Sequence, residues 1–376
     1  MSTHSIEETR TTSNPTILAG LWFAPAILAA ALAVTEATQI MIPPPALAAV
    51  ASVPLFAANH QPSALEGGIV LSLVIDAADP DTLYAGSLWG GVFKSGDGGA
   101  SWSQTGLAHT GIFSLVIDPT DRATLYAGGN GVFKSTDAGR SWTAIDGDLT
   151  ELNATVALVI DPTNPATLYA GTSYGSVFKT GDGGSSWTAV DSGLPGDYIY
   201  SLAIDPTRPT TLYAGTYEGV YMTTNGGRRW TAMSAGLAES SINVLVIDPA
   251  NSSTLYAGTP GGIFKTTNGG RRWTTVAGLG DLNVNALAID PVDPATIYAG
   301  GDGVVFKSTD GGASWSALSS GLGAAFVNVL AIDSSNPAKI HVGTYGGVFK
   351  TVDGGASWTA AGSGLTAPPT RSRTVA

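Results

Sequence analysis

The chain has 376 residues, of which only 12% are charged, and its formal net charge is −12. This acidic balance argues against a nucleic-acid partner, because proteins that bind nucleic acid present basic faces. The absence of cysteine excludes disulfides, a thiol nucleophile and Cys-ligated zinc, and it leaves the compartment open.

Residues 17–34 form an uncharged apolar run that only Pro25 interrupts. The run is short for a membrane span and long for the core of a signal peptide. Small-x-small sites follow it at Ala46–Ala48 and Ala49–Ala51. We therefore expect residues 1–51 to be a signal peptide or an uncleaved signal-anchor, and the protein to be exported to the periplasm, the cell surface or the medium.

Two features of this segment leave alternatives open. Glu7 and Glu8 outweigh Arg10, so no basic region precedes the apolar run, and a buried helix is the competing interpretation. Met41 could be the start in place of Met1, which would leave a shorter signal. Contact with a membrane is expected only through the apolar run.

The segments on either side of the central region have their own composition. Residues 52–67 are expected to be a linker, with one short strand at Val53–Ala57. Residues 366–376, which include Pro368 and Pro369, are expected to be a disordered tail. The folded domain is therefore expected to span 68–365.

Within that domain one octapeptide, S/T-x-D-x-G-x-x-W, recurs seven times at intervals of 40 to 45 residues. A period in the low forties is typical of a propeller blade. The copies are SGDGGASW (95–102), STDAGRSW (135–142), TGDGGSSW (180–187), TTNGGRRW (223–230), TTNGGRRW (266–273), STDGGASW (308–315) and TVDGGASW (351–358).

Each repeat predicts four short strands, named A to D from the hub to the rim. In the third repeat these are Ala157–Ile160, Thr167–Gly171, Ser176–Thr180 and Ser186–Val190, each bounded by turn residues. Four strands in each of seven repeats predict an all-β fold, a seven-bladed β-propeller of four-stranded antiparallel blades.

The phase of the repeats predicts how the ring closes. The first A strand begins near Val70 and the last D strand is Trp358–Ala361, so all seven sheets are complete without exchange of a strand between the two ends. Closure is then expected to rest on side-chain packing between the first and last blades. The alternative is that Val53–Ala57 adds to a sheet edge.

The octapeptide suits a hairpin corner between strands C and D. The short Asp side chain accepts hydrogen bonds from the N–H groups just ahead, and Gly takes the positive φ of the turn. The Trp, as at Trp315, is expected to be a buried anchor on the D strand. Asn225 and Asn268 replace the Asp in two copies, and Ala138 replaces one Gly.

These octapeptides resemble the Asp-box, or BNR repeat. The repeat occurs in sialidases, sortilin-type receptor domains, xyloglucan-cleaving glycoside hydrolases and a photosystem II assembly propeller. The resemblance covers about 300 residues when each motif is counted with its repeat. It implies the propeller fold, and it implies that the box is a structural corner remote from the functional site.

Acids that repeat in every blade are interpreted as turn formers, so functional residues are sought where the repeats differ. The A strands all end in Asp, most often before Pro. The B–C turns and D–A segments share one face, and they carry aromatic and acidic residues that would suit a sugar or a peptide. The ligand-binding candidates on the B–C turns are Trp89, Tyr174, Tyr217, Glu218, Asp302 and Tyr345.

The main functional prediction is a non-enzymatic binding or scaffolding module for a protein or carbohydrate partner, and the protein is expected to be a monomer. The alternative is a sugar-binding lectin, or a xyloglucanase-like glycoside hydrolase with Glu218 and Asp302 as its acids. A sialidase site is not expected, because it needs converging arginines and the arginines here lie in A–B turns and Asp-boxes, on the other face. No metal site or cofactor is expected, since the four histidines share no ligand spacing.

A basic patch is predicted on the Asp-box face. Two adjacent repeats carry paired arginines, and these could dock an acidic partner or anionic lipid, although a solvated rim is the simpler interpretation. The partner-docking candidates are Arg228, Arg229, Arg271 and Arg272.

Overall fold

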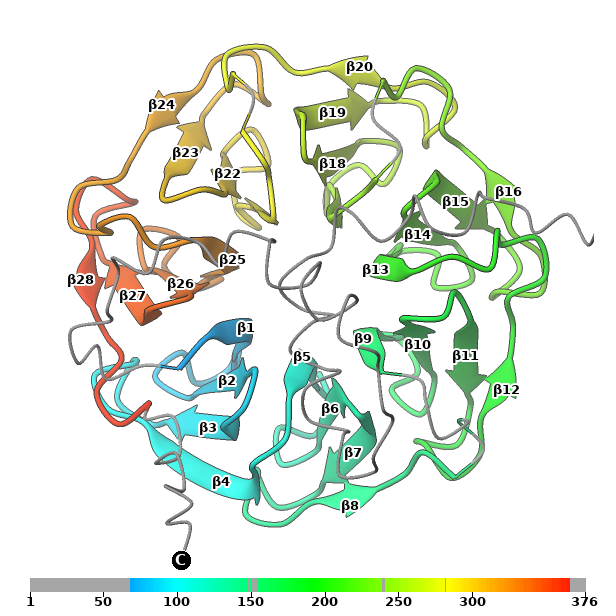
Figure 1. Cartoon of the computed structure of the whole chain (residues 1–376), viewed down its shortest axis with the longest axis horizontal. Coiled ribbons are helices and arrows are strands. Elements are labelled where there is room, and N and C mark those ends of the chain that lie inside the picture. Colours follow the sequence, from blue (N-terminus) through cyan, green and yellow to red (C-terminus); the bar gives the residue numbers. More distant parts are fainter. Residues whose placement is uncertain (1–67, 148, 150–153, 239–240, 281, 366–376) are drawn as a thin grey trace, which may run out of the picture. The chain divides into compact units, whose positions relative to one another are not determined.

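The computed structural model describes residues 68–147, 149, 154–238, 241–280 and 282–365. These residues form seven four-stranded antiparallel sheets around a common axis (Figure 1). The predicted all-β, seven-bladed propeller is thus confirmed. The expected export segment, linker and C-terminal tail (1–51, 52–67 and 366–376) lie outside the described residues. Within the described ranges, no helix is long and apolar enough to cross a membrane.

Each blade uses four strands that are consecutive in the chain, and its innermost strand comes first. The innermost (A) strands are β1 (Val70–Ile75), β5 (Ile112–Ile117), β9 (Thr155–Ile160), β13 (Ile199–Ile204), β17 (Val244–Ile247), β21 (Ala286–Ile289) and β25 (Val327–Ile332). The B strands are β2 (Leu83–Ser87), β6 (Leu125–Gly129), β10 (Leu168–Thr172), β14 (Leu212–Thr216), β18 (Leu255–Thr259), β22 (Ile297–Gly300) and β26 (Ile340–Thr344).

The C strands are β3 (Gly91–Ser95), β7 (Gly131–Ser135), β11 (Val177–Thr180), β15 (Gly219–Thr223), β19 (Gly262–Thr266), β23 (Val305–Ser308) and β27 (Gly347–Thr351). The D strands are β4 (Ser103–Ala108), β8 (Thr143–Ala144), β12 (Thr188–Ala189), β16 (Thr231–Ala232), β20 (Thr274–Thr275), β24 (Ser316–Ala317) and β28 (Thr359–Ala360).

Six of these D strands are only two residues long, which is shorter than predicted. In the third blade the expected strand Ser186–Val190 reduces to β12, Thr188–Ala189. The reason lies in the corner, because the Ser186 N–H donates to Asp182 Oδ1 at 2.9 Å and is not available to the ladder. The side-chain bonds of the corner thus replace part of the strand pairing.

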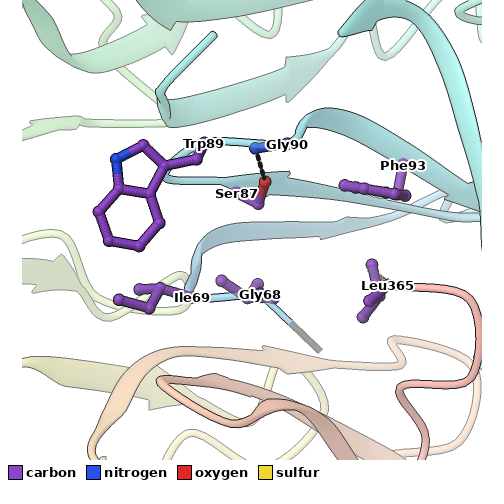
Figure 2. Close-up of a pocket in the computed structure, with 8 residues that line it drawn as sticks. Gly68, Ile69, Ser87, Trp89, Gly90, Phe93 and Leu365 are labelled. Atoms are coloured by element: carbon purple, nitrogen blue, oxygen red, sulfur yellow. Dashed lines mark hydrogen bonds between the residues drawn. The ribbon is translucent and has the colours of Figure 1, made fainter. Parts of the chain in front are cut away.

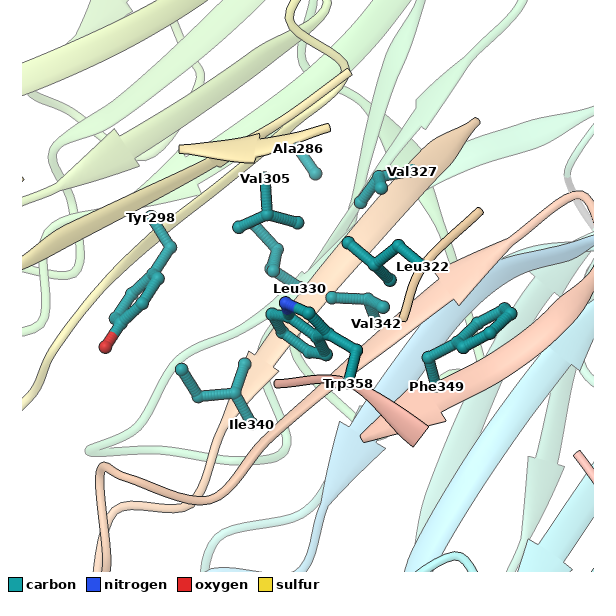
Figure 3. Packing of buried hydrophobic residues seen from close by; sticks show 10 residues of the cluster. All are labelled: Ala286, Tyr298, Val305, Leu322, Val327, Leu330, Ile340, Val342, Phe349 and Trp358. Carbon is teal, nitrogen blue, oxygen red and sulfur yellow. The ribbon is translucent and has the colours of Figure 1, made fainter. Parts of the chain in front are cut away.

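The core is divided among the interfaces between blades. Seven clusters of buried side chains occur in the described residues, one at each interface between neighbouring sheets. Figure 3 shows the cluster between the sixth and seventh blades, where Tyr298 and Val305 face Ile340, Val342 and Trp358. Each blade therefore buries its two faces only against its neighbours, as expected for a repeat architecture.

The ring closes by an interface of the same kind, between the seventh and first blades. Val348, Ala361 and Leu365 pack with residues of β1, β2 and β3. The closure also uses hydrogen bonds, from Gly68 N to Leu365 O at 3.0 Å and from the Asn328 amide to Val70 O at 3.0 Å. Closure by packing between complete sheets was predicted; the added hydrogen bonds were not.

The tryptophans of the octapeptides occupy two environments. Five are buried, as expected: Trp102, Trp187, Trp230, Trp273 and Trp358. Trp142 and Trp315 are less buried than expected, because each side chain is only half-buried. Ala138, in the corner of the second blade, adopts a positive φ of 58°, so this corner keeps its shape without the glycine.

Candidate functional site

The mouth of the hub on the face of the B–C turns is the candidate site. The A strands begin at this face, around the central opening (Figure 1). The position at the rim is therefore the second residue of the A strand in blades one to four and seven, and the residue just before the A strand in blades five and six. In chain order this position holds Leu71, Phe113, Val156, Tyr200, Asn243, Asn285 and Asn328, all of them half-buried. The mouth is therefore apolar or aromatic in the first four blades and amide-bearing in the last three.

The asparagines at this side of the mouth (Asn243, Asn283, Asn285 and Asn328) are called the amide arc; the first three are joined by hydrogen bonds from Asn243. The Asn243 amide nitrogen lies 2.9 Å from Asn283 Oδ1, 3.1 Å from Val284 O and 3.3 Å from Asn285 Oδ1. These bonds join the fifth and sixth blades, and the bond from Asn328 joins the seventh to the first. The amide nitrogens of Asn243 and Asn328 are thus held by protein acceptors, which orients these two side chains before any ligand arrives.

Beside this arc, aromatic and acidic residues gather around the fourth blade, whose innermost strand neighbours that of the fifth blade. The rings of Tyr198 and Tyr200 stack with their centroids 4.4 Å apart. Asp197 Oδ1 accepts the Tyr198 N–H at 2.8 Å, while its buried Oδ2 has no partner among the described residues. Glu218, on the exposed B–C turn, lies close enough to Asp197 for their charges to interact.

The titration of this acidic and aromatic group is shifted. Burial, and to a lesser degree the charge of Glu218, raises the pKa of Asp197 against the opposing hydrogen bond from Tyr198. Burial raises the pKa of Tyr200 to about 12, and the charge of Asp197 adds to that effect. Buried carboxylates with raised pKa values are common at functional sites, so Asp197 is the strongest single candidate here.

A second aromatic pair lies between the sixth and seventh blades. The rings of Phe326 and Tyr345 are 5.3 Å apart, and the Tyr345 N–H donates to Phe326 O at 3.2 Å. Burial raises the pKa of Tyr345, and the charge of Asp302 on the neighbouring turn raises it further. The sequence-predicted candidates Asp302 and Tyr345 thus belong together, as do Tyr217 and Glu218, but each pair sits on its own side of the ring.

The remaining predicted residues of this face stand apart. Tyr174 is 64% exposed on the third blade and Trp89 is 42% exposed on the first. Figure 2 shows a cavity beside Trp89, where the Gly90 N–H donates to Ser87 Oγ at 2.7 Å. Its volume is only about 10 Å³, which is room for a single water. This cavity therefore belongs to the packing of the turn.

On the opposite face, the hub opens through an apolar recess of about 430 Å³. Its walls come from the ends of three A strands and from the prolines that follow them, including Pro206, Pro249 and Pro291. All lining side chains are apolar, so the recess offers no side-chain polar group to orient a ligand. In the described part of the chain, no group of three or more His or acidic residues could hold a metal ion.

The mouth residues are not among the candidates predicted from the sequence, because the A strands were expected to have only a structural role. A signal was present in the repeats. The position five residues before the strand-ending Asp changes to Asn in three consecutive blades, at 243, 285 and 328. That change breaks the repeat in the way expected of a functional position.

Two family models match parts of the chain. One, described as sortilin, neurotensin receptor 3, matches residues 130–237, and the other, described as photosynthesis system II assembly factor YCF48, matches residues 197–321. No curated protein sequence matches the chain.

Several solved structures share the fold. A GH74 enzyme from Niastella koreensis superposes with a TM-score of 0.67 at 20% identity, covering 80% of this chain and 55% of its own. YCF48 from Cyanidioschyzon merolae gives 0.62 at 18% identity, covering 75% and 94%. YCF48 bound to a D1 peptide gives 0.59 at 16% identity, covering 76% and 93%. This chain spans about half the length of the GH74 enzymes, and at these identities the similarity shows the fold alone.

Proposed function

We propose that this chain, a seven-bladed propeller built of BNR-type (Asp-box) repeats, is a non-enzymatic binding module that holds an extended segment of a protein partner at the hub mouth. The observation that supports this best is the composition of the mouth, where the amide arc lies next to a stacked pair of tyrosines on the neighbouring fourth blade. Amides recognise peptide groups through paired hydrogen bonds, and aromatic rings cover apolar side chains with little loss of entropy.

Two further facts favour a peptide over a large substrate. The cavity beside Trp89 is too small to enclose a sugar ring, and the exposed aromatics Trp89, Tyr174 and Tyr345 stand on turns around an opening. A propeller of the same fold, YCF48, has been solved with a D1 peptide bound. The D1 peptide is the ligand of that protein, and the example supports the idea that a propeller of this fold can bind a peptide.

A screen of peptide and glycan arrays with the full chain tests the proposal. We expect peptide hits whose affinity falls about tenfold or more in the double variant Tyr217→Ala/Tyr345→Ala, since partly exposed aromatic side chains are typical anchors of a binding surface. Val352→Ala, an exposed apolar residue of an Asp-box, is the matched control and should bind as the wild type does. Hits confined to glycans, or peptide hits insensitive to the double variant, would count against the proposal.

A second candidate function is glycoside hydrolysis, and one observation favours it. Asp197, with its raised pKa, lies beside Glu218, whereas Glu218 and Asp302 belong to blades that are not adjacent. An acid with a raised pKa next to a second carboxyl group is the arrangement that glycosidases use. Xyloglucan hydrolysis abolished by Asp197→Asn and by Glu218→Gln, and retained in Asp302→Asn, would replace the binding proposal with this one.

Export is part of the proposal and rests on the apolar run at 17–34. Sequencing the N-terminus of the protein recovered from outside the cytoplasm distinguishes the two forms. Cleavage near Ala48 or Ala51 indicates a signal peptide, and an intact start on a membrane-bound chain indicates an anchor.

A further inference from the structure

The Asp-boxes of the fourth and fifth blades differ from the other five in two linked positions. Elsewhere the box carries Asp at its third position and Ser at its seventh. In these two blades the same positions hold Asn225 with Arg229, and Asn268 with Arg272. Asp becomes Asn only where Ser becomes Arg.

In an ordinary box the Asp is fully engaged by that Ser. Asp182 Oδ1 accepts the Ser186 N–H at 2.9 Å, and Asp182 Oδ2 accepts the Ser186 hydroxyl at 2.6 Å. These bonds hold the pKa of the carboxyl well below its usual range, so it stays negative at neutral pH. The carboxylate is therefore a fixed charge at the corner, directly beside the seventh position of the box.

The Asn variants keep the backbone bond of the corner and remove the charge. Asn225 Oδ1 accepts the Arg229 N–H at 3.1 Å, and Asn268 Oδ1 accepts the Arg272 N–H at 3.0 Å. The corner thus has the same shape without an acid that could pair with the arginine. With a second arginine before it, each box changes from a net charge of −1, as in SGDGGASW, to +2.

The four arginines are exposed and stand on adjacent blades. None of them forms an ion pair with another described residue, whereas Arg208 on the same face is committed to Asp205 at 2.9 Å and to Ser252 Oγ at 3.1 Å. Asp205 is itself buried, and Asp248 is occupied by the N–H groups of its own turn, so neither neutralises the arginines. We call the patch formed by Arg228, Arg229, Arg271 and Arg272 the arginine patch.

We infer that the arginine patch is a second docking site, for a short acidic segment of a protein partner. The small size of the patch favours a partner with a small contact area over a large surface such as a membrane or a nucleic-acid duplex. The same face carries acids in the turns of the first, second and sixth blades, among them Asp79, Asp121 and Asp293, and a charged Asp in the other five boxes. A membrane or a duplex would meet these acids, whereas a narrow segment can touch the arginines alone, since salt screens charges beyond about 8 Å.

The experiment uses the full chain and a fluorescein-labelled oligoglutamate peptide, with binding followed by fluorescence anisotropy. The variant Asn225→Asp/Arg229→Ser/Asn268→Asp/Arg272→Ser restores the sequence of the ordinary boxes, so its corners should fold with the Asp–Ser bonds seen elsewhere. We expect the peptide to bind the wild type, to be weakened by added salt, and to lose about tenfold or more in affinity in this variant.

Controls separate this site from the hub mouth and from other anionic surfaces. Arg140→Ala, which removes the single arginine of the second blade's Asp-box, and Tyr217→Ala, on the opposite face, should leave oligoglutamate binding unchanged. Adding phosphatidylserine to phosphatidylcholine vesicles should not increase the amount of protein that sediments with them, since any contact through the apolar run at 17–34 does not depend on lipid charge. Failure of the peptide to bind, equal binding by the restored-box variant, or co-sedimentation with vesicles that is lost in that variant would overturn the inference.

Discussion

At the scale of single residues, His341 is the most unusual side chain of the ring. It occupies the position that holds Tyr in the other six blades, where Tyr256, for example, donates its hydroxyl to Gly311 O of the next Asp-box at 3.0 Å. His341 Nε2 lies 3.1 Å from Gly98 O, so it makes the equivalent contact across the closing interface. It is fully buried, and its Nδ1 has no partner among the described residues.

The environment of His341 keeps it neutral. Burial lowers its pKa from 6.5 to about 4 and outweighs the opposing contact with the Gly98 carbonyl. The positive charges of Lys339 and Lys350 lower it further, and Asp333 acts weakly in the other direction. The closing interface therefore contains a group that protonates much more readily in the unfolded chain than in the folded one.

We predict that His341 makes the stability of the propeller depend on pH. Between pH 6.5 and about 4 the unfolded chain binds a proton that the folded chain does not, so the free energy of unfolding falls as the pH falls. The full loss is about 3 kcal/mol, since each unit of pKa is worth about 1.4 kcal/mol. His341→Tyr should remove this component and restore the contact made by the other blades. Denaturant unfolding of both proteins at neutral pH and near pH 4.5 measures the difference, and identical pH profiles would contradict the assignment.

At the scale of elements, the tryptophan of each Asp-box fastens its blade to the one before. The Trp230 indole N–H donates to Val190 O at 2.7 Å, and the backbone N–H of the same residue donates to Ser192 O at 2.8 Å. Both acceptors lie in the D–A connection of the preceding blade, three and five residues after its own Trp. Trp102 repeats the pattern across the closing interface, on Ala361 O and Ser363 O.

Two tryptophans depart from this pattern, and both follow a short connection. Trp142 and Trp315 donate their indole N–H to their own boxes, at Gly139 O and Gly312 O. The distance along the chain from Trp to the next strand-ending Asp is 18 residues in three blades, but 16 from Trp102 and 17 from Trp273. These two short connections directly precede the blades of Trp142 and Trp315, so the two departures coincide with the two shortest spacings among these five.

Replacing these side chains should therefore have unequal effects. Trp273→Ala removes a buried indole and its 2.7 Å bond to Met233 O, and we expect it to cost about 3–5 kcal/mol. Trp315→Ala, in the next blade, removes a half-buried ring bonded only within its own corner, and should cost about 2 kcal/mol less. Chemical denaturation of the two variants provides the comparison. Equal losses would show that the interblade bonds contribute little.

At the scale of the whole molecule, the blade count, strand order and phase could be predicted because each depends on local sequence. The period and the turn residues locate the strands, and the phase of the first and last repeats gives seven complete sheets. The candidate site could be predicted only in part. The turn residues Tyr217, Glu218 and Tyr345 can be predicted because they differ from the residues at the same positions in the other repeats. The amide arc cannot, because Asn243, Asn285 and Asn328 lie at the starts of three different A strands, and only the closed ring brings these starts to one opening.

Apart from His341, the closing interface is built from the same kinds of contact as the other interfaces, and this similarity leads to the last prediction. Its core cluster, its Trp102 bonds and the close approach of Gly343, where an added Cβ would lie 2.6 Å from Val70, all recur between other blades. Gly68 N lies 3.0 Å from Leu365 O, so the two ends of the propeller are adjacent. A ring held by seven like interfaces should not depend on where its chain begins.

We therefore expect a circular permutant to fold, in which residue 365 is joined to residue 68 and new ends are opened between Pro195 and Gly196. Gly196 is exposed in a D–A connection, where breaks are tolerated best. Circular dichroism and thermal unfolding should show the same β-rich fold and a single transition near that of the 68–365 fragment with its original ends. The fragment serves as the control for removal of the flanking segments. A permutant that unfolds in two steps, or not cooperatively, would mean that the original closing interface differs in kind from the rest.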